Sequence, residues 1–179
     1  MVISVARAIV LSGWLAGLGG FVPPCQSATI EVFYAPEDLP GDKLVSIYDG
    51  ARHYIFVAVY SITFPPAVKA LVSAKKRGVD VRVITDREQI HDSKQHAALS
   101  ALRLAGIPIR INQHDGLMHL KQVVVDDLLN TSGSMNLTTS GHRYNDERLD
   151  VIIDPITSAK ARDKFLSMWR DPVRYEPWQ

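Results

Sequence analysis

A stretch near the middle of the chain, MHLKQVVVDDLLNTSGSMNLT, combines strand-like apolar runs with four polar side chains that could do chemistry together. His119 and Lys121 are two residues apart, so on a β-strand they point to the same face. Ser134 and Asn136 repeat this spacing, and Gly133 beside them allows a close backbone approach. If the two segments are neighbouring strands, an imidazole, an ammonium, a hydroxyl and an amide converge on one spot. Such a group of donors with one titratable nucleophile suits a tetrahedral anion, and phosphate is the obvious candidate.

Two other residues of the same stretch are an odd number of positions from His119 and Lys121, so on a strand they would point to the opposite face. Asp126 ends the apolar run and need not touch whatever His119 touches. Gln122 also faces away from the predicted site, so we expect it to affect packing only.

The rest of the chain alternates between strand-like and helix-like segments, which must position these residues. We predict strands over 29–35, 54–62, 79–86, 107–113, 119–126, 128–134 and 150–154, and helices over 42–52, 64–78, 93–106 and 155–171. A tight turn at the DD pair joins the two polar strands. This order predicts an α/β fold in one domain, with a mixed, largely parallel sheet flanked by helices on both faces.

The first 28 residues differ in composition from the rest of the chain. They contain no Asp or Glu, one cation (Arg7), and the apolar run AIVLSGWLAGLGGFV followed by PPCQSA. This is typical of a secretory signal peptide, cut after Ser27 or Ala28, so we expect a secreted or periplasmic protein with its domain over 29–179. An uncleaved membrane anchor is the alternative, but the run is short and its four glycines and the PP pair argue against a membrane-spanning helix.

Cleavage would also change the chemistry available to the protein. The single Cys25 would be lost, which leaves no disulfide and no thiolate metal site. The formal net charge is +1, and removing Arg7 leaves +1 − 1 = 0. A neutral domain lacks the overall basic character of many nucleic-acid-binding proteins, so an anionic substrate must be held by local positive charge.

The spacing of the polar stretch resembles a known family signature. His119-x-Lys121-x4-Asp126, then six residues, then Gly133-Ser134-x-Asn136 is similar to the HKD motif of the phospholipase D superfamily at every defined position. The whole chain from about 29 to 171 resembles the small, single-motif branch of secreted, EDTA-resistant endonucleases. The resemblance therefore implies the phospholipase D/nuclease fold.

The same resemblance implies roles for individual residues. It makes His119 the nucleophile that attacks phosphorus and forms a phosphohistidine. Lys121 and Asn136 would bind the non-bridging oxygens, and Ser134 would be a supporting donor. Glu147, in YNDERLDVII, matches the acidic residue that orients the histidine ring. Asp126 would have a structural role.

In-line displacement at phosphorus predicts the assembly. The nucleophile and the proton donor for the leaving oxygen must lie on opposite sides of the phosphorus, and one imidazole cannot serve both. Larger members of the superfamily carry two such motifs, whereas this chain has one. We therefore expect a homodimer with His119 from each subunit across a shared site on the twofold axis.

We therefore predict a metal-independent phosphodiesterase without a cofactor that hydrolyses its substrate through a phosphohistidine intermediate, namely a nonspecific DNA/RNA endonuclease. A phospholipase D that cleaves phosphatidylcholine-like lipids is the alternative, because both substrates are phosphodiesters. A third possibility is a non-catalytic nucleic-acid-binding dimer, although binding alone needs no nucleophile.

The remaining histidines do not predict a metal site. The pairs in HDSKQH and HDGLMH are five residues apart, which suits neither a helix face nor a strand face. We expect His91, His96 and His142 to be surface residues, and His114 to lie in a loop that lines the cleft.

Overall fold

The computed structural model describes residues 27–179 of the chain. The predicted signal peptide therefore lies almost entirely outside the described residues, as does Cys25. Within residues 27–179, no helix is both long enough and apolar enough to cross a membrane.

The core of the fold is one eight-stranded sheet with the strand order β1-β7-β6-β5-β2-β3-β4-β8. The strands are β1 (Thr29–Ala35), β2 (Tyr54–Val59), β3 (Asp80–Thr85), β4 (Ile109–Asn112), β5 (Lys121–Val125), β6 (Leu129–Gly133), β7 (Glu147–Ile153) and β8 (Tyr175–Pro177). The central β2 is an uninterrupted apolar run because helices cover both of its faces.

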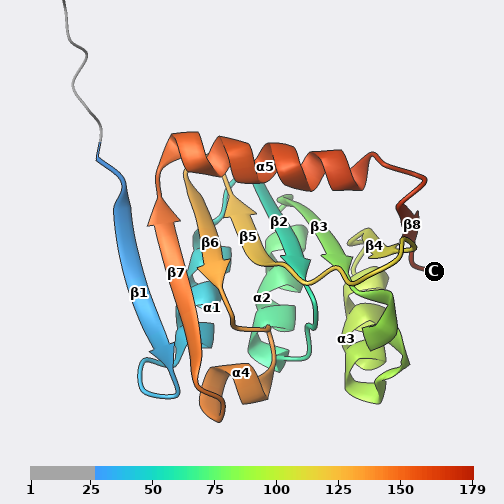
Figure 1. Ribbon diagram of the computed structural model, residues 1–179, viewed down its shortest axis with the longest axis horizontal. Helices are drawn as coiled ribbons and strands as arrows, with labels where there is room; N and C mark the ends of the chain where they lie inside the picture. Colours follow the sequence, from blue (N-terminus) through green and yellow to red (C-terminus); the bar gives the residue numbers. More distant parts are fainter. Residues whose placement is uncertain (1–26) are drawn as a thin grey trace, which may run out of the picture.

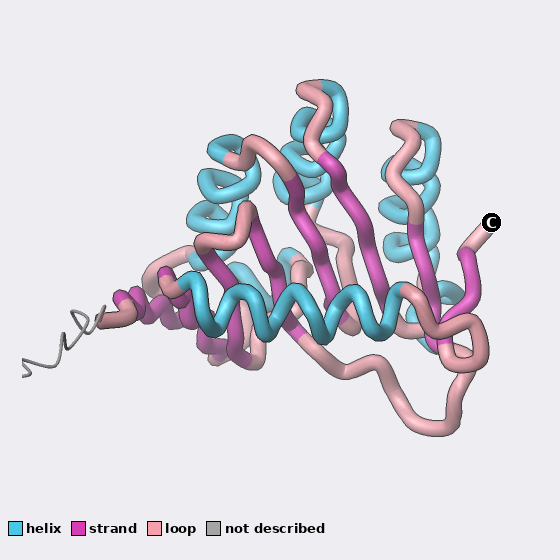
Figure 2. The backbone as a smooth tube through the Cα atoms, turned by 90° about the horizontal axis from the view of Figure 1, so that it is seen from above, coloured by secondary structure: helices cyan, strands magenta, loops and turns pink. Residues whose placement is uncertain are grey.

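Helices cover the sheet in two layers, as Figures 1 and 2 show. The helices are α1 (Pro40–Gly50), α2 (Pro65–Lys76), α3 (Ser93–Leu104), α4 (Thr139–Arg143) and α5 (Pro155–Trp169), with the short 3-10 helix η1 (Arg87–His91) before α3. The helices α1, α2 and α3 lie on one face, and α5 crosses the other. On the α5 face Phe56 of β2 stacks on Phe165, with ring centroids 4.8 Å apart.

The fold class is confirmed as a single α/β domain with a mixed sheet and helices on both faces, but the share of parallel pairing is smaller than predicted. Only β2–β3 and β3–β4 are parallel, and the other five pairings are antiparallel. The reason is that β5 and β6 form a hairpin, that β7 returns antiparallel to β6 after the short α4, and that antiparallel partners occupy both sheet edges.

The predicted turn at the DD pair is present between β5 and β6. Asp126 and Asp127 both have positive φ, at 53° and 54°, and the Leu128 amide donates to the Val125 carbonyl over 3.1 Å. Two consecutive left-handed residues occupy the centre of this turn, and the three residues 126–128 separate Val125 from its strand partner Leu129.

The prediction that His142 is a surface residue is wrong. Its side chain is 1% exposed, Nδ1 accepts a hydrogen bond from the Gly41 amide (3.1 Å), and the ring packs on Phe64. Burial lowers its pKa, although nearby Asp42 opposes this shift and Arg143 adds to it. The cause is α4, which was not predicted and which turns this part of the chain against α1.

Candidate active site at one end of the sheet

The pairing of the strands brings the predicted residues to one end of the sheet. Lys121 is the first residue of β5 and pairs with Val59, the last residue of β2. Because β6 is antiparallel to both β5 and β7, its end lies beside the start of each. Ser134, just after β6, and Glu147, the first residue of β7, therefore belong to the same end as Lys121. The antiparallel pairing of β5, β6 and β7 thus brings Lys121, Ser134 and Glu147 to one end of the sheet.

His119 lies in the loop just before β5 rather than on the strand itself. Its side chain is exposed, and its carbonyl accepts a hydrogen bond from Lys121 Nζ over 3.0 Å. The pKa of Lys121 is lowered because the ammonium is partly buried, while the negative charge of Glu147 opposes that shift. The pKa of Lys121 in β5 is therefore sensitive to the charge of Glu147 in β7.

Ser134 and Glu147 form a hydrogen-bonded pair. Ser134 Oγ donates to Glu147 Oε2 and accepts from the Arg148 amide over 3.1 Å, while Asn145 Nδ2 donates to Glu147 Oε1 over 3.1 Å. Within residues 27–179 the His119 ring donates no hydrogen bond to Glu147, so the orienting role that the resemblance implies for Glu147 stays a prediction. The carboxylate instead holds Ser134 and acts on Lys121 through its charge.

Gly133 makes the close approach between β6 and β7 possible. Its φ is +144°, and a Cβ at this position would lie 2.0 Å from the Arg148 carbonyl oxygen. The hydrogen bond from the Ser134 amide to that same oxygen (3.0 Å) depends on this contact.

Asn136 lies next to the segment that follows β2. Its neighbour Leu137 forms an isolated parallel bridge with Ile62, and the Leu137 amide donates to the Ser61 carbonyl. Asn136 Oδ1 is buried and has no hydrogen-bond partner within the described part of the chain. The amide is thus not committed to a structural contact at this end of the sheet.

Gln122 points to the opposite face of the sheet, as its parity predicts, and Asp126 is remote because it lies in the turn after β5. Asp126 lies at the opposite end of β5, about 16 Å from Lys121 at the usual rise of a strand. Its carboxylate accepts hydrogen bonds from the amides of Arg52 (2.7 Å), His53 (2.8 Å) and Tyr54 (2.9 Å), which fixes the start of β2. Burial alone would raise the pKa of Asp126, but these donors lower it below its ordinary value. Gln122 Nε2 donates to the Ala161 carbonyl of α5 over 3.2 Å.

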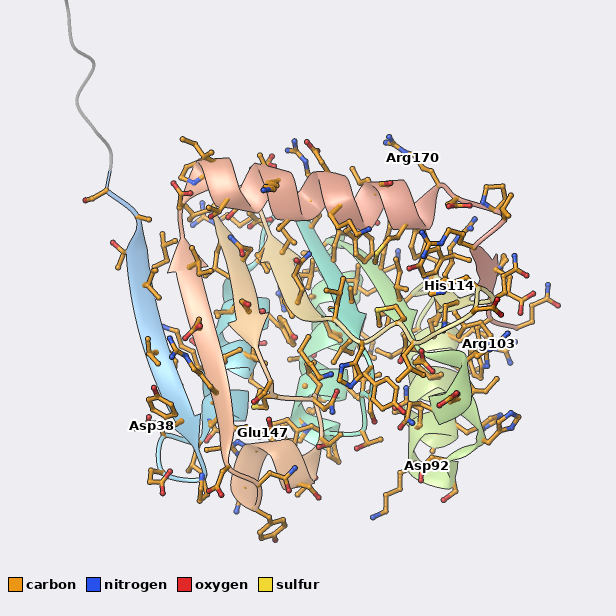
Figure 3. The ribbon with its side chains drawn as sticks, in the orientation of Figure 1. Asp38, Asp92, Arg103, His114, Glu147 and Arg170 are labelled. Atoms are coloured by element: carbon orange, nitrogen blue, oxygen red, sulfur yellow. The ribbon has the colours of Figure 1, made fainter. Side chains whose placement is uncertain are left out.

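The surface around the candidate residues is open rather than deeply hollowed. His119 lines a hollow of about 190 Å³ that it shares with His114, as predicted, and with Lys164 and Arg174. Ser134 and Glu147 line a separate hollow of about 430 Å³. Figure 3 shows Glu147 near the α4 end of β7 and His114 in the loop that approaches β8, on the two flanks of this open surface. A larger, mostly apolar hollow of about 660 Å³ between α2 and α3 contains none of the predicted residues.

Three residues that support the site were not predicted, namely Tyr60, Asp86 and Asn112. Tyr60 contacts His119 and Lys121 through its ring. Asp86 and Asn112 are fully buried and hold the loop before β5, through the Met118 amide and the Gly116 carbonyl respectively. Tyr60 directly follows the run YIFVAV of β2, and Asp86 directly follows the run VRVIT of β3. Asn112 follows the run IRI and is the last residue of β4. For Asp86 and Asn112 the signal was present in the sequence, because polar residues at the carboxyl ends of parallel strands meet at one edge of the sheet.

Within residues 27–179 there is no group of three or more His, Cys, Asp or Glu side chains that could hold a metal ion. Metal independence nevertheless stays a prediction, because it concerns the reaction.

Comparison with known proteins identifies the family. The profile of a family described as "Cardiolipin synthase, PLD-like domain" matches residues 44–169, which is most of the chain. A mitochondrial cardiolipin hydrolase from Xenopus laevis is 30% identical over 128 residues, which cover 70% of this chain and 60% of that protein. A phospholipase D from Rickettsia bellii is 30% identical over 121 residues, covering 68% of this chain and 57% of that protein. The chain thus spans about 60% of the length of these relatives.

Solved structures show the same fold. The crystal structure of Nuc from Salmonella typhimurium, a phospholipase D family member, superposes with a TM-score of 0.79 at 29% identity, covering 86% of this chain and 99% of that one. NucT from Helicobacter pylori superposes with a TM-score of 0.74 at 24% identity, covering 80% of this chain and 96% of that one.

Proposed function

Because the chain belongs to the phospholipase D superfamily, we propose that it is a metal-independent phosphodiesterase that acts through a phosphohistidine intermediate. The observation that supports this proposal most directly is the meeting of β5, β6 and β7 at one end of the sheet, where Lys121 and Ser134 of the spaced HKD signature lie together with Glu147. Lys121 is partly desolvated there, and Ser134 is held by its neighbours. Donors prearranged in this way stabilise the charge that develops on a phosphoryl group in the transition state.

The proposed reaction has two displacements at phosphorus. In the first, a neutral imidazole nitrogen of His119 forms a bond to phosphorus while the bond to the leaving oxygen breaks, and an acid on the opposite side protonates that oxygen. In the second, the group that gave the proton takes one from water, the resulting hydroxide attacks phosphorus, and the bond to His119 breaks. Lys121 and Asn136 bind the non-bridging oxygens throughout.

We propose that the acid is the partner's His119 in a twofold homodimer. The open form of the surface supports this, since His119 and the Ser134–Glu147 pair line separate shallow hollows and nothing in residues 27–179 covers them. A second copy placed over this end would enclose the reacting phosphate and supply a second imidazole.

For the substrate we propose DNA or RNA, cleaved as an endonuclease. The domain after the predicted signal peptide is small, and cations that include Lys164 and Arg174 lie beside His119 on an otherwise near-neutral chain. Local positive charge of this kind binds a phosphate backbone and makes the affinity fall as salt rises.

A phospholipid is the second candidate substrate, and two observations favour it. Relatives at 30% identity carry the names cardiolipin hydrolase and phospholipase D. In addition, Leu117 and Leu120 beside His119 are 44% and 36% exposed, so apolar side chains flank the proposed nucleophile.

The experiment that tests the proposal is a paired assay of the purified protein in excess EDTA. One arm uses plasmid DNA and the other uses phosphatidylcholine vesicles, and each arm includes His119→Gln and the matched control His91→Gln at an exposed histidine. We expect EDTA-resistant cleavage of DNA that falls about 1,000-fold or more in His119→Gln and is retained in His91→Gln.

Each other outcome has a definite meaning. Release of the lipid headgroup with intact DNA would assign the phospholipid as substrate. Binding of DNA by both wild type and His119→Gln without turnover would indicate a non-catalytic binding dimer. Activity that needs a metal ion would contradict the proposed mechanism.

We also propose that the protein is exported and that the signal peptide is removed after Ser27 or Ala28. Mass spectrometry of protein isolated from outside the cytoplasm would detect a chain that begins at Ala28 or Thr29. Recovery of the intact chain in the membrane fraction would instead indicate an anchor.

A further inference from the structure

Tyr60, which directly follows β2, contacts both proposed catalytic residues of β5 and its preceding loop. Its ring centroid is 5.0 Å from that of His119 with the ring planes at 63°, an edge-on arrangement. Lys121 Nζ lies 5.4 Å from the centroid of the same ring. One aromatic ring therefore contacts the imidazole and the ammonium at the same time.

The backbone of Tyr60 is tied to the same segment. Its amide donates a hydrogen bond to the carbonyl of Leu120 over 3.0 Å, and Leu120 is the residue between His119 and Lys121. Its own carbonyl accepts from Thr85 Oγ1 of the neighbouring β3 over 3.0 Å. The ring thus projects from a fixed backbone and has little freedom to follow a moving imidazole.

The far end of the ring is also held. Gln89 Nε2, in η1, donates to the Tyr60 hydroxyl over 2.8 Å. The start of η1 is fixed by the fully buried Asp86, whose Oδ1 accepts from the Glu88 amide over 2.9 Å. The other carboxylate oxygen of Asp86 accepts from the amide of Met118, the residue before His119. One buried carboxylate therefore holds both the backbone that leads into His119 and the helix that holds Tyr60.

We propose that Tyr60 is a positioning residue for phosphoryl transfer: its ring fixes the angle of the His119 imidazole and the place of the Lys121 ammonium, with Gln89 and Asp86 as supports. His119 is exposed and lies in a loop, so without such a contact its ring could rotate freely about its side-chain bonds. An attacking group must be aligned with phosphorus to react, so a rotating imidazole would attack less often. This inference rests on the proposed function of His119 as the nucleophile.

The experiment measures kcat and KM with a small chromogenic phosphodiester, bis(p-nitrophenyl) phosphate, in EDTA. This probe avoids the choice between nucleic acid and lipid. The variants are Tyr60→Leu, which removes the ring, and Tyr60→Phe, which keeps the ring and removes only the hydroxyl. The matched control is Tyr54→Leu, because Tyr54 lies at the opposite end of β2, stacks on Phe56 and bonds Asp127.

We expect Tyr60→Leu to lower kcat by about 10- to 100-fold while KM changes by less than about 3-fold, and Tyr60→Phe to recover most of that loss. Tyr54→Leu should lower the thermal midpoint and leave kcat of the folded protein unchanged. In NMR spectra the His119 ring protons should shift in Tyr60→Leu and keep their position in Tyr60→Phe, since the ring current of the aromatic group acts on them.

The outcomes separate this inference from the proposed function. If wild type and His119→Gln hydrolyse the probe equally, the proposed function fails. If His119→Gln is inactive and Tyr60→Leu keeps the wild-type kcat, the function stands and the positioning role is overturned. Equal losses of kcat in Tyr60→Leu and Tyr54→Leu, or no recovery in Tyr60→Phe, would also overturn it.

Discussion

Lys121 shows how strongly its neighbours control one charged side chain at the proposed site. Partial burial at the start of β5 lowers its pKa from the ordinary 10.5, and the negative charge of Glu147 raises it. The ammonium form must be present to bind a phosphate oxygen. Activity should therefore fall as the pH rises through the pKa of Lys121 in the folded protein.

Glu147→Gln removes the charge that raises the pKa of Lys121, so the pKa falls further and the ammonium is lost at a lower pH. We expect the alkaline limb of the kcat/KM profile to move to lower pH. The measurement is a pH–rate profile of wild type and variant with the same chromogenic phosphodiester. Glu176→Gln, at an exposed position on β8, is the control and should leave the limb in place. An alkaline limb that stays fixed or moves upward in Glu147→Gln would contradict the coupling.

At this scale the sequence predicted that Lys121 and Ser134 lie at the same end of the sheet, but not how each side chain is held. Strand parity was enough to separate Gln122 from Lys121, whereas Asp126 is excluded because it lies in the turn beyond the far end of β5. Parity could not reveal that Glu147 bonds Ser134 rather than the His119 ring, because that choice depends on side-chain rotation. Tyr60 was not predicted as part of the site, because an aromatic residue at the end of an apolar run is typical of a buried strand.

The contact between β6 and β7 depends on the one glycine that ends β6. Gly133→Ala would place a methyl group 2.0 Å from the Arg148 carbonyl oxygen, on a backbone with φ of +144°. The atoms nearest to this methyl group are backbone atoms of Arg148 and Leu149, which cannot rotate away as a side chain would, so the two strands must separate locally. We expect a loss of about 2 to 4 kcal/mol in the free energy of unfolding and a displaced Ser134.

Urea unfolding followed by circular dichroism would measure this loss, with Gly50→Ala as the matched control. A Cβ at Gly50, the last residue of α1, would meet nothing within 4 Å, so this variant should be neutral or more stable by up to about 1 kcal/mol. Equal stability of the two variants would show that the β6–β7 contact tolerates a methyl group.

Helices and strands were predicted correctly where the segment itself contains the sequence signals of that structure. They were missed where the structure depends on contacts with other parts of the chain. The helix over 64–78 has prolines in its first turn, cations in its last and Gly78 beyond, and α2 follows this pattern. In contrast, β8 is only three residues long, and it is a strand because the edge of β4 offers unpaired backbone groups. The five-residue α4 is likewise defined by the Thr138 cap and by packing of His142 against Phe64.

At the scale of the whole molecule, the proposed site is open on one side. The strand ends that carry Lys121 and Ser134 lie at the surface, and in Figure 1 α5 crosses the sheet near the opposite ends of these strands, although its Lys164 and Met168 line the hollow beside His119. The single spaced motif provides one nucleophile, whereas the reaction also needs an acid on the opposite side of the phosphorus. A second copy of the chain would cover the open surface and would supply the missing acid. The homodimer could be proposed from the sequence, because the reaction needs a second imidazole. The surfaces through which the two subunits would contact each other could not be predicted in this way.

A subunit-mixing experiment tests this assembly, because one site that needs two His119 side chains responds to dilution differently from independent sites. Equal amounts of wild type and His119→Gln are unfolded together and refolded, so that the subunits assort at random. If both imidazoles are required, only wild-type pairs are active, and the rate falls to about a quarter of that of the same total amount of wild type. If each subunit works alone, the rate falls only to about half. Mixing with His91→Gln should preserve the full rate, which controls for losses in refolding. A rate of one half, together with a monomeric mass in sedimentation, would leave the leaving-group acid to be sought within one chain, where His114 in the same hollow as His119 is the first residue to replace.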